Sequence, residues 1–194
     1  MWVECKLCCV NITWRNKEFD EQVIDMNYTK LLKADIANGP GFRLTLWVTG
    51  CMRKCPGCFN EEAQDPDFGK KFDDDAKKRI FKELAEPTCD GLSLMGGEPL
   101  SKCSDNRKEV IKLCKECREK FPNKSQWMWS GYTFEEIASD PSMRDILNYV
   151  DVIVDGPFVE SRKDLSCPFR GSSNQRVIDV KKTMERKHVV EVKF

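Results

Sequence analysis

Segments with the period of a strand alternate with segments with the period of a helix between residues 42 and 156. Residues 42–49, "FRLTLWVT", alternate apolar and more polar side chains, which predicts a strand. Residues 73–86 begin with three aspartates, place Ile80 and Leu84 on one helical face and end before Pro87, which predicts a helix. The other predicted strands are residues 91–95, 125–130 and 149–156, and the other predicted helices are residues 104–121 and a segment with a capping box at Thr133 and Glu136. This alternation predicts an α/β fold, either a parallel sheet or a partial parallel β/α barrel.

The charge and hydropathy of the chain argue against two large classes of function. Lys plus Arg equals Asp plus Glu at 32 each, so this chain of 194 residues has no net basic charge to attract nucleic acid. No stretch of about 18 residues lacks a charge, and the N-terminus has no apolar signal-peptide core. We therefore expect a cytoplasmic protein that binds neither nucleic acid nor a membrane.

The sequence pattern divides the chain into two parts. Residues 1–25 show weak periodicity and carry Cys5, Cys8 and Cys9, which lack a matching second pair with zinc-finger spacing. We interpret these residues as an N-terminal appendage of unassigned role and residues 26–194 as a single domain. Two C-terminal segments, "RVIDV" and "HVVEVKF", have a strand-like composition but no predicted place in the sheet.

Four loops rich in cysteine, glycine and polar residues follow the predicted strands. The carboxyl ends of parallel strands share one edge of a sheet, where α/β proteins build their sites, so we expect the loops to meet. In chain order they contain Cys51, Cys55 and Cys58; then Gly96, Gly97, Glu98 and Pro99; then Ser130, Gly131 and Tyr132; then Asp155, Gly156 and Pro157.

The spacing of Cys51, Cys55 and Cys58 indicates a metal centre. The chain has 11 cysteines, 33% charged residues and no sign of secretion, which favours metal ligands or core residues over disulfides. Residues 51–58, "CMRKCPGC", place three thiols on one loop, and soft thiolates of this kind can hold three of the four irons of an iron–sulfur cube. A structural zinc site is the alternative, but it needs four ligands, usually in paired C-x2-C units.

The other cysteines between residues 89 and 167 and the histidine have plainer interpretations. Cys114 and Cys117 fall on one helical stripe with Val110 and Phe121, which predicts core packing and not a metal site. His188 is the only histidine and is far in sequence from every motif, so we expect no histidine acid–base catalysis. Isolated cysteines stand at Cys89, Cys103 and Cys167.

The cysteine and glycine motifs together resemble those of a known superfamily. "CMRKCPGC" resembles the cluster loop of the radical S-adenosylmethionine (SAM) enzymes, and "GGEP" at residues 96–99 resembles their second signature. "NGPGFR", "CPGCFN", "GLSLMGGEPL", "WSGY", "VDVIVDGPF" and "FRGSSNQR" narrow the resemblance to activating proteins of anaerobic (class III) ribonucleoside-triphosphate reductases. The resemblance covers about residues 26–178, and its one small departure is Phe59, where many relatives carry tyrosine.

The resemblance implies a fold, two cofactors and a reaction. The implied fold is the incomplete parallel β/α barrel of radical SAM type, with a [4Fe-4S] cluster on Cys51, Cys55 and Cys58 and SAM on the fourth iron. Reductive cleavage of SAM would give a 5′-deoxyadenosyl radical, which removes hydrogen from a glycine of the reductase and leaves a glycyl radical. The implied partners are that reductase and a flavodoxin-like electron donor.

The resemblance also assigns residues around the cofactors. Because the cofactors carry out the chemistry, we expect no catalytic side chain. Gly96 and Gly97 would let the backbone approach SAM. The other implied SAM residues are Gly57, Cys58, Phe59, Glu98 and Pro99. Plainer alternatives are a core position for Phe59 and an exposed turn carboxylate for Glu98. The candidate contacts with SAM or the partner are Ser130, Tyr132, Asp155, Arg170, Asn174 and Gln175, which are otherwise strand-end caps and loop residues.

Two other functions remain open from the sequence. One is a small radical SAM enzyme that acts on a small molecule, similar to 7-carboxy-7-deazaguanine synthase; the "RGSSNQR" segment argues against it. The other is a zinc- or iron–sulfur-binding module without SAM chemistry, which leaves "GGEP" unexplained.

Overall fold

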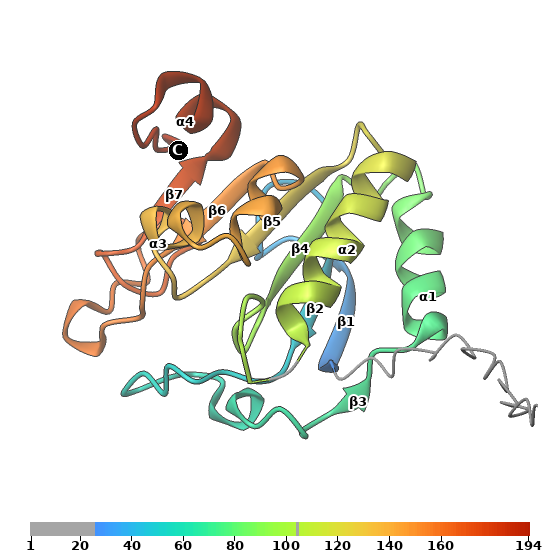
Figure 1. Ribbon diagram of the computed structural model, residues 1–194, viewed down its shortest axis with the longest axis horizontal. Coiled ribbons are helices and arrows are strands. Elements are labelled where there is room, and N and C mark those ends of the chain that lie inside the picture. Colours follow the sequence, from blue (N-terminus) through green and yellow to red (C-terminus); the bar gives the residue numbers. More distant parts are fainter. Residues whose placement is uncertain (1–25, 104) are drawn as a thin grey trace, which may run out of the picture.

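The structure, a computed structural model, describes residues 26–103 and 105–194. In this part of the chain one seven-stranded sheet has the strand order β3-β1-β2-β4-β5-β6-β7 (Figure 1). The strands are β1 (Asn27–Asp35), β2 (Arg43–Val48), β3 (Lys70–Lys71), β4 (Gly91–Gly96), β5 (Ser125–Trp129), β6 (Val152–Asp155) and β7 (Arg176–Asp179). The α-helices are α1 (Asp74–Leu84), α2 (Asn106–Lys120), α3 (Phe134–Ser139) and α4 (Val180–Arg186). The predicted appendage, with Cys5, Cys8 and Cys9, lies outside the described residues.

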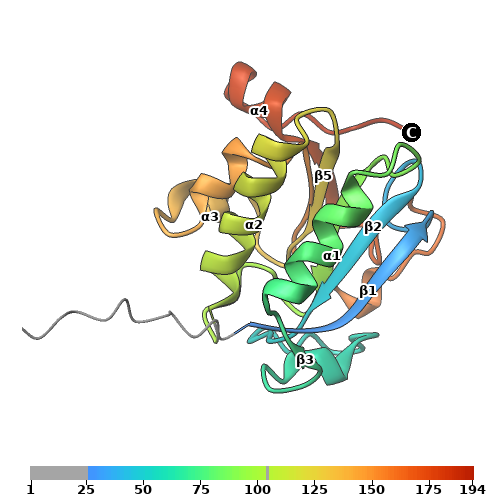
Figure 2. The same cartoon turned by 90° about the vertical axis from the view of Figure 1, so that its right-hand side faces the viewer.

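The sheet is parallel at its centre and antiparallel at its edges. The four predicted strands form β2, β4, β5 and β6, and these are parallel neighbours in the sheet. On one side β1 runs antiparallel to β2 (Figure 2) and to the short β3. On the other side β7 runs antiparallel to β6. The sequence therefore predicted the parallel centre correctly, whereas the complete sheet is mixed.

The three predicted helices, α1, α2 and α3, are present within a few residues of their predicted bounds, whereas α4 was not predicted. Asp73 caps α1 by accepting a hydrogen bond from the Ala76 amide, and the predicted capping box of α3 is present. Helix α2 begins at Asn106; Ser104, with which the predicted segment began, lies outside the described residues. Strand β6 is shorter than predicted because a 3-10 helix, Arg144–Asn148, ends directly before the turn into it. No helix in the described ranges is long and apolar enough to cross a membrane.

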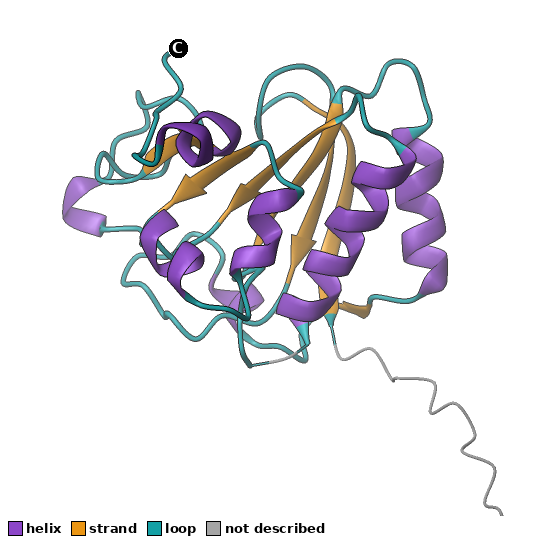
Figure 3. Cartoon of the chain, turned by 45° about the horizontal axis from the view of Figure 1, so that its top comes forward, coloured by secondary structure: helices purple, strands orange, loops and turns teal. Residues whose placement is uncertain are grey.

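The main core lies between the sheet and the helices on one of its faces (Figure 3). Alternate residues of β2 and β4 point toward these helices and are at most 1% exposed, because strand side chains alternate between faces. The core side chains include Leu44, Leu46, Leu92, Leu94, Met128 and Ile153 from the strands and Ile80, Leu84, Val110, Leu113 and Ile137 from the helices.

The other face of the sheet carries a buried arginine. The Arg43 side chain, at the start of β2, is 1% exposed and donates hydrogen bonds to the Ser93 hydroxyl and the Leu92 carbonyl, at 2.6 and 2.8 Å. Its guanidinium also lies 5.6 Å from the centre of the Trp127 ring. Nearby, the buried Asp35 carboxylate accepts a hydrogen bond of 2.6 Å from the Thr45 hydroxyl. These polar contacts lie at the end of the sheet opposite the cysteine motif.

Candidate functional site

The four loops that follow the parallel strands are joined in two pairs by backbone hydrogen bonds. The Gly97 and Glu98 amides donate to the carbonyls of Val48 and Gly50, at 2.8 and 3.0 Å, which joins the loop after β4 to the loop after β2. The Ser130 amide likewise donates to the Val154 carbonyl at 2.9 Å, which connects the ends of β5 and β6. The structure therefore gathers the predicted motifs at one edge of the sheet.

The three cysteines lie on residues 51–60, which we call the cysteine loop. Their thiols are half-buried, and all eight cysteines in the described ranges are free. The amides of Gly50 and Cys51 donate to the carbonyls of Ala63 and Gln64, at 2.8 and 3.0 Å, and fix the start of the loop. Gly57 has a φ of 67°, a left-handed conformation that glycine adopts without strain.

Cys51 is the most distinctive of the three thiols. Burial raises the pKa of this thiol, whereas hydrogen bonds from the backbone amides of Arg53 and Lys54 act in the opposite direction. Lys54 itself has a φ of 46°, so the chain turns sharply here and its amide faces back toward Cys51. Amide donors to sulfur are one of the features by which proteins tune iron–sulfur clusters.

The loop offers donors of the kind that an iron–sulfur cluster requires. Three free thiols, all soft ligands, come from a single loop, which matches the donor set of a cluster with one open iron. Next to them, a cavity of about 360 Å³ is lined by Cys58, Phe59, Asn60, Glu61 and Glu62. The buried Asn60 Nδ2 has no hydrogen-bond partner within the described residues. In those same residues, no three Cys, His, Asp or Glu side chains are grouped to hold a single metal ion.

The glycine pair after β4 allows two loops to approach closely. Gly96 has a φ of 116°, and a Cβ atom on it would lie 2.3 Å from the Val48 carbonyl oxygen. A Cβ on Gly97 would lie 2.6 Å from the Ala63 carbonyl oxygen. Because real Cβ atoms do not come this close to backbone, both positions require glycine, as the motif predicts. Pro99, the last residue of the motif, is buried.

Glu98 is a buried carboxylate with protein partners on both oxygens. It is 2% exposed, and it accepts hydrogen bonds from the Leu100 amide, the Ser130 hydroxyl and the Gly131 amide, at 3.1, 2.8 and 2.7 Å. The pKa of Glu98 is raised above its ordinary value, because the effect of burial outweighs these hydrogen bonds and the charge of Arg53, which lower it. The alternative of an exposed turn carboxylate is therefore wrong, because the side chain joins the loops after β4 and β5.

Arg53 is a site residue that the sequence reasoning missed. Its guanidinium lies 4.2 Å from the centre of the Tyr132 ring. Its Nε is 3.9 Å from Glu98 Oε2, and its Nη2 is 3.6 Å from Glu136 Oε2. Nothing in "CMRKCPGC" distinguishes Arg53 from the neighbouring Lys54, because only the fold brings Glu98 and Tyr132 next to this position.

The other predicted residues at the strand ends bind protein groups. The Ser130 hydroxyl donates to Glu98, and Asp155, 1% exposed, accepts from the Phe134 amide and Arg176 Nε, at 2.7 and 3.0 Å. These contacts fit the interpretation of Ser130 and Asp155 as strand-end caps, whereas Tyr132 packs against Arg53.

The predicted residues of "FRGSSNQR" hold their own loop against the end of β6. Asn174 Nδ2 donates to the Pro157 carbonyl at 2.8 Å, and Gln175 Nε2 donates to the Gly156 carbonyl at 3.0 Å. Arg170 Nη1 donates to the Gln175 carbonyl at 3.1 Å. The loop is thus fixed by its own polar side chains at the same edge as the cysteine loop.

Gly57 and Phe59 are both exposed on the cysteine loop. Phe59 is 79% exposed, so its interpretation as a core residue is wrong, and its ring meets Trp47 edge to face with centroids 6.1 Å apart. A Cβ on Gly57 would lie 2.7 Å from Glu160 Oε1, so the loop after β6 also reaches the cysteine loop.

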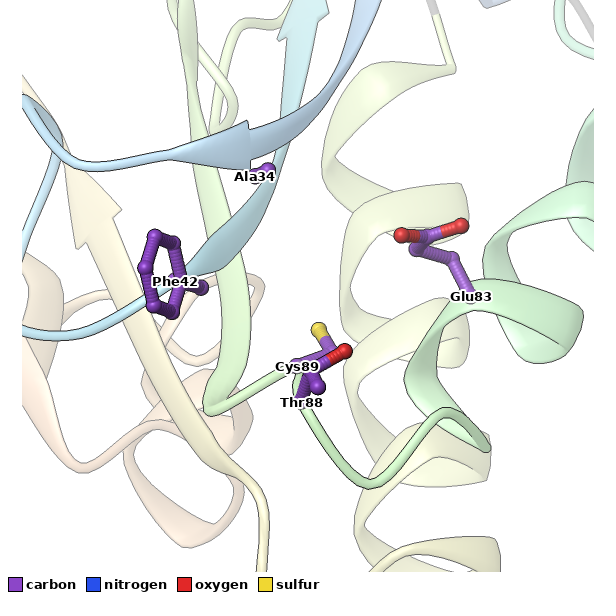
Figure 4. Close-up of a pocket in the computed structure, with 5 residues that line it drawn as sticks. All are labelled: Ala34, Phe42, Glu83, Thr88 and Cys89. Atoms are coloured by element: carbon purple, nitrogen blue, oxygen red, sulfur yellow. The ribbon is translucent and has the colours of Figure 1, made fainter.

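Cys89, Cys114, Cys117 and His188 lie away from this edge. Cys114 and Cys117 are at most 2% exposed in the main core, which confirms the core prediction, and burial raises the pKa of Cys117 to about 12. His188 is exposed on the turn after α4. A second cavity, of about 260 Å³, is lined by Ala34, Phe42, Glu83, Thr88 and Cys89 (Figure 4). It lies at the amino ends of β2 and β4, opposite the cysteine loop.

Comparisons with known proteins agree with this geometry. Residues 37–178 match the family model of the 4Fe-4S single cluster domain, so the fold and the thiol loop define an iron–sulfur protein. The anaerobic ribonucleoside-triphosphate reductase-activating protein of Enterobacteria phage T4 is 39% identical over 152 residues, which cover 78% of this chain and 93% of that protein. The protein of the same name from Escherichia coli K12 is 38% identical over 154 residues, 78% of this chain and 97% of that protein. The chain therefore belongs to the family of anaerobic ribonucleoside-triphosphate reductase-activating proteins.

Proposed function

We propose that this chain activates an anaerobic ribonucleoside-triphosphate reductase by reductive cleavage of SAM on a [4Fe-4S] cluster. The observation that carries the proposal is the meeting of two motifs at the carboxyl edge of the sheet. Backbone hydrogen bonds from Gly97 and Glu98 to Val48 and Gly50 hold the glycine turn against the residues that lead directly into the loop with three free thiols. Relatives named as activating proteins of this reductase support the substrate.

The residues proposed to hold the cluster are Cys51, Cys55 and Cys58, which leaves one iron free for SAM. When bound, the reduced cluster supplies one electron that splits SAM into methionine and a 5′-deoxyadenosyl radical, which removes hydrogen from a glycine of the reductase. The chain's own part is to hold and orient both cofactors.

The proposed SAM site uses the backbone of the glycine turn and the exposed end of the cysteine loop. Gly96, Gly97, Glu98 and Pro99 would place backbone groups beside SAM, and both glycines keep this turn packed closely against the backbone of Val48 and Ala63. Glu98 would act by fixing the turn, since its carboxylate already binds Ser130 and Gly131. We propose that Gly57, Cys58 and Phe59 contact the adenine of SAM, since Cys58 and Phe59 line the cavity described above.

The four parallel strands, with helices on one face and the site at their carboxyl ends, support an incomplete β/α barrel of radical SAM type in residues 26–194. Such a barrel is open, so a glycine-bearing loop of the reductase could enter from the edge that carries Phe59. We propose that Arg170, Asn174 and Gln175 shape one wall of the entrance for this loop. We also propose a flavodoxin-like protein as the electron donor and the cytoplasm as the compartment. Residues 1–25 are proposed as a separate appendage.

Anaerobic reconstitution tests the cofactors. We expect about four irons and four sulfides per chain and a spin-resonance signal of the reduced cluster that changes on addition of SAM. Cys51→Ala should abolish SAM cleavage, whereas Cys117→Ala, a buried core position, should retain it. A zinc-only protein, or a cluster whose spectrum ignores SAM, would contradict the proposal and favour a simple metal-binding module.

A second experiment tests the substrate. The reduced, loaded protein is mixed with SAM and an anaerobic ribonucleoside-triphosphate reductase, and the expected result is the doublet of a glycyl radical on the reductase. If 5′-deoxyadenosine forms only with a small-molecule substrate and no doublet appears, the chain is a different radical SAM enzyme.

A further inference from the structure

Arg53 makes contacts that join the cysteine loop to three other segments of the site. It lies between the first two cysteines of the loop, and its side chain is 23% exposed. Its charged group contacts Glu98 in the turn after β4, Tyr132 after β5 and Glu136 in α3. Within the described part of the chain, the buried Nε has no hydrogen-bond partner, so electrostatic attraction and stacking hold this side chain.

The surroundings of Arg53 are shaped to receive it. A Cβ atom on Gly131 would lie 2.3 Å from Arg53 Cδ and 3.3 Å from Glu98 Oε2. The glycine after β5 therefore leaves space that the arginine side chain fills. On the far side, the Tyr132 ring provides a flat surface that suits a planar guanidinium better than the ammonium of lysine.

The charge of Arg53 is held where water screens it weakly. Its partner Glu98 has a side chain only 3% exposed, so their attraction is stronger than that of an exposed pair. The neighbouring Lys54 carries the same charge on an exposed side chain, where water and salt screen it. The chain thus contains two adjacent cations that differ in how firmly they are placed.

We propose that Arg53 is a positioning residue that ties the cysteine loop to Glu98 and Tyr132, and that its fixed charge raises the reduction potential of the cluster. The second part rests on the proposed function, while the first part concerns the chain alone. One-electron reduction by an external donor adds one negative charge to the cluster. Removing the positive charge of Arg53 from between two of the proposed ligands, while the carboxylates of Glu98 and Glu136 remain, therefore disfavours the reduced form.

The first test uses the protein without iron under reducing conditions. Urea unfolding is measured for Arg53→Met, Glu98→Gln, the double variant and the control Lys54→Met. We expect a coupling between Arg53 and Glu98 of about three- to tenfold in the unfolding constant, as for other residues in contact, and little effect from Lys54→Met. Additive effects of Arg53→Met and Glu98→Gln would overturn the tie between the loops, whether or not the protein binds a cluster.

The second test measures the cluster itself. Arg53→Met, Arg53→Lys and Lys54→Met are reconstituted, and the midpoint potential of each cluster is determined by mediated titration followed by spin resonance, without SAM or reductase. We expect a lower potential in Arg53→Met than in Lys54→Met, with Arg53→Lys between Arg53→Met and the unmodified protein. Equal potentials in Arg53→Met and Lys54→Met would overturn the electrostatic part. Loss of the cluster in the unmodified protein would instead contradict the proposed function.

Discussion

Replacing Gly96 by alanine should destabilise the protein through backbone strain and a steric clash. The same replacement at Gly156 should cause backbone strain alone, so comparing the two variants separates the effects. Gly96 is the last residue of β4 and Gly156 directly follows β6, at the same edge of the sheet, with φ values of 116° and 94°. A Cβ on Gly96 would lie 2.3 Å from the Val48 carbonyl oxygen and 2.8 Å from its nitrogen, whereas a Cβ on Gly156 meets nothing within 4 Å. Gly156→Ala therefore isolates backbone strain, and Gly96→Ala adds a steric clash.

The magnitudes follow from these contacts. An alanine with positive φ costs about 1 to 2 kcal/mol, which is the expected loss for Gly156→Ala. The clash at Gly96 cannot be relieved by a side-chain rotation, because Val48 belongs to a strand paired on both sides. Overpacking of this kind costs about 1 to 3 kcal/mol more, so Gly96→Ala should lose about 2 to 5 kcal/mol in total.

Urea unfolding of the reduced, iron-free protein, followed by circular dichroism, measures both losses. The slope of the unfolding free energy with urea should be the same for both variants if the surface exposed on unfolding is unchanged. Equal losses for Gly96→Ala and Gly156→Ala would refute the argument, because the close approach of β4 to β2 would then contribute nothing.

Two further predictions concern the end of the sheet opposite the site. Arg43→Met should destabilise the protein by about 3 kcal/mol, since the buried Ser93 hydroxyl and Leu92 carbonyl lose the hydrogen bonds that Arg43 donates. Urea unfolding measures this loss, and a loss below about 1 kcal/mol would contradict the prediction. Burial raises the pKa of Asp35, but hydrogen bonds, including that from Thr45, outweigh this and leave the pKa below its usual value of 3.8. The ionised form therefore stabilises the protein above about pH 4 and stops doing so as the pH falls through the lowered pKa, so the disadvantage of Asp35→Asn should shrink in acid. A disadvantage in unfolding free energy that stays constant from pH 7 to pH 3 would contradict this.

The predicted parallel strands illustrate why periodicity is informative in the centre of the sheet. In β2 and β4 the residues that face the helices are all apolar, because one face of each strand must be buried. Strand β1 escaped prediction because it runs near the edge of the sheet, where Leu32 and Lys33 are exposed and no strict alternation is needed. Strand β7 has a suitable composition in "RVIDV", but its antiparallel place beside β6 depends on the path of the preceding loop.

The candidate site divides in the same way. The spacing of Cys51, Cys55 and Cys58 and the glycine pair were visible in the sequence, because a cluster loop and a close backbone approach each demand particular residues at fixed intervals. The burial of Glu98 and the exposure of Phe59 were not visible in the sequence, because burial depends on which other parts of the chain the fold places over a side chain. Glu98 is 2% exposed and Phe59 is 79% exposed, the reverse of the plainer expectation for each.

The sequence alone thus determined the α/β pattern, the thiol triplet, the glycine turn and the family resemblance, since these are encoded in residues close together along the chain. Only the tertiary structure decided that the sheet is mixed and that Arg53 meets Glu98 and Tyr132. Arg53 and Tyr132 are far apart in sequence, and their contact arises from the parallel order of β2, β4 and β5, which brings the ends of separate strands to one edge. Long-range contacts of this kind have no local signature, because the energy that fixes them comes from the packing of the whole sheet.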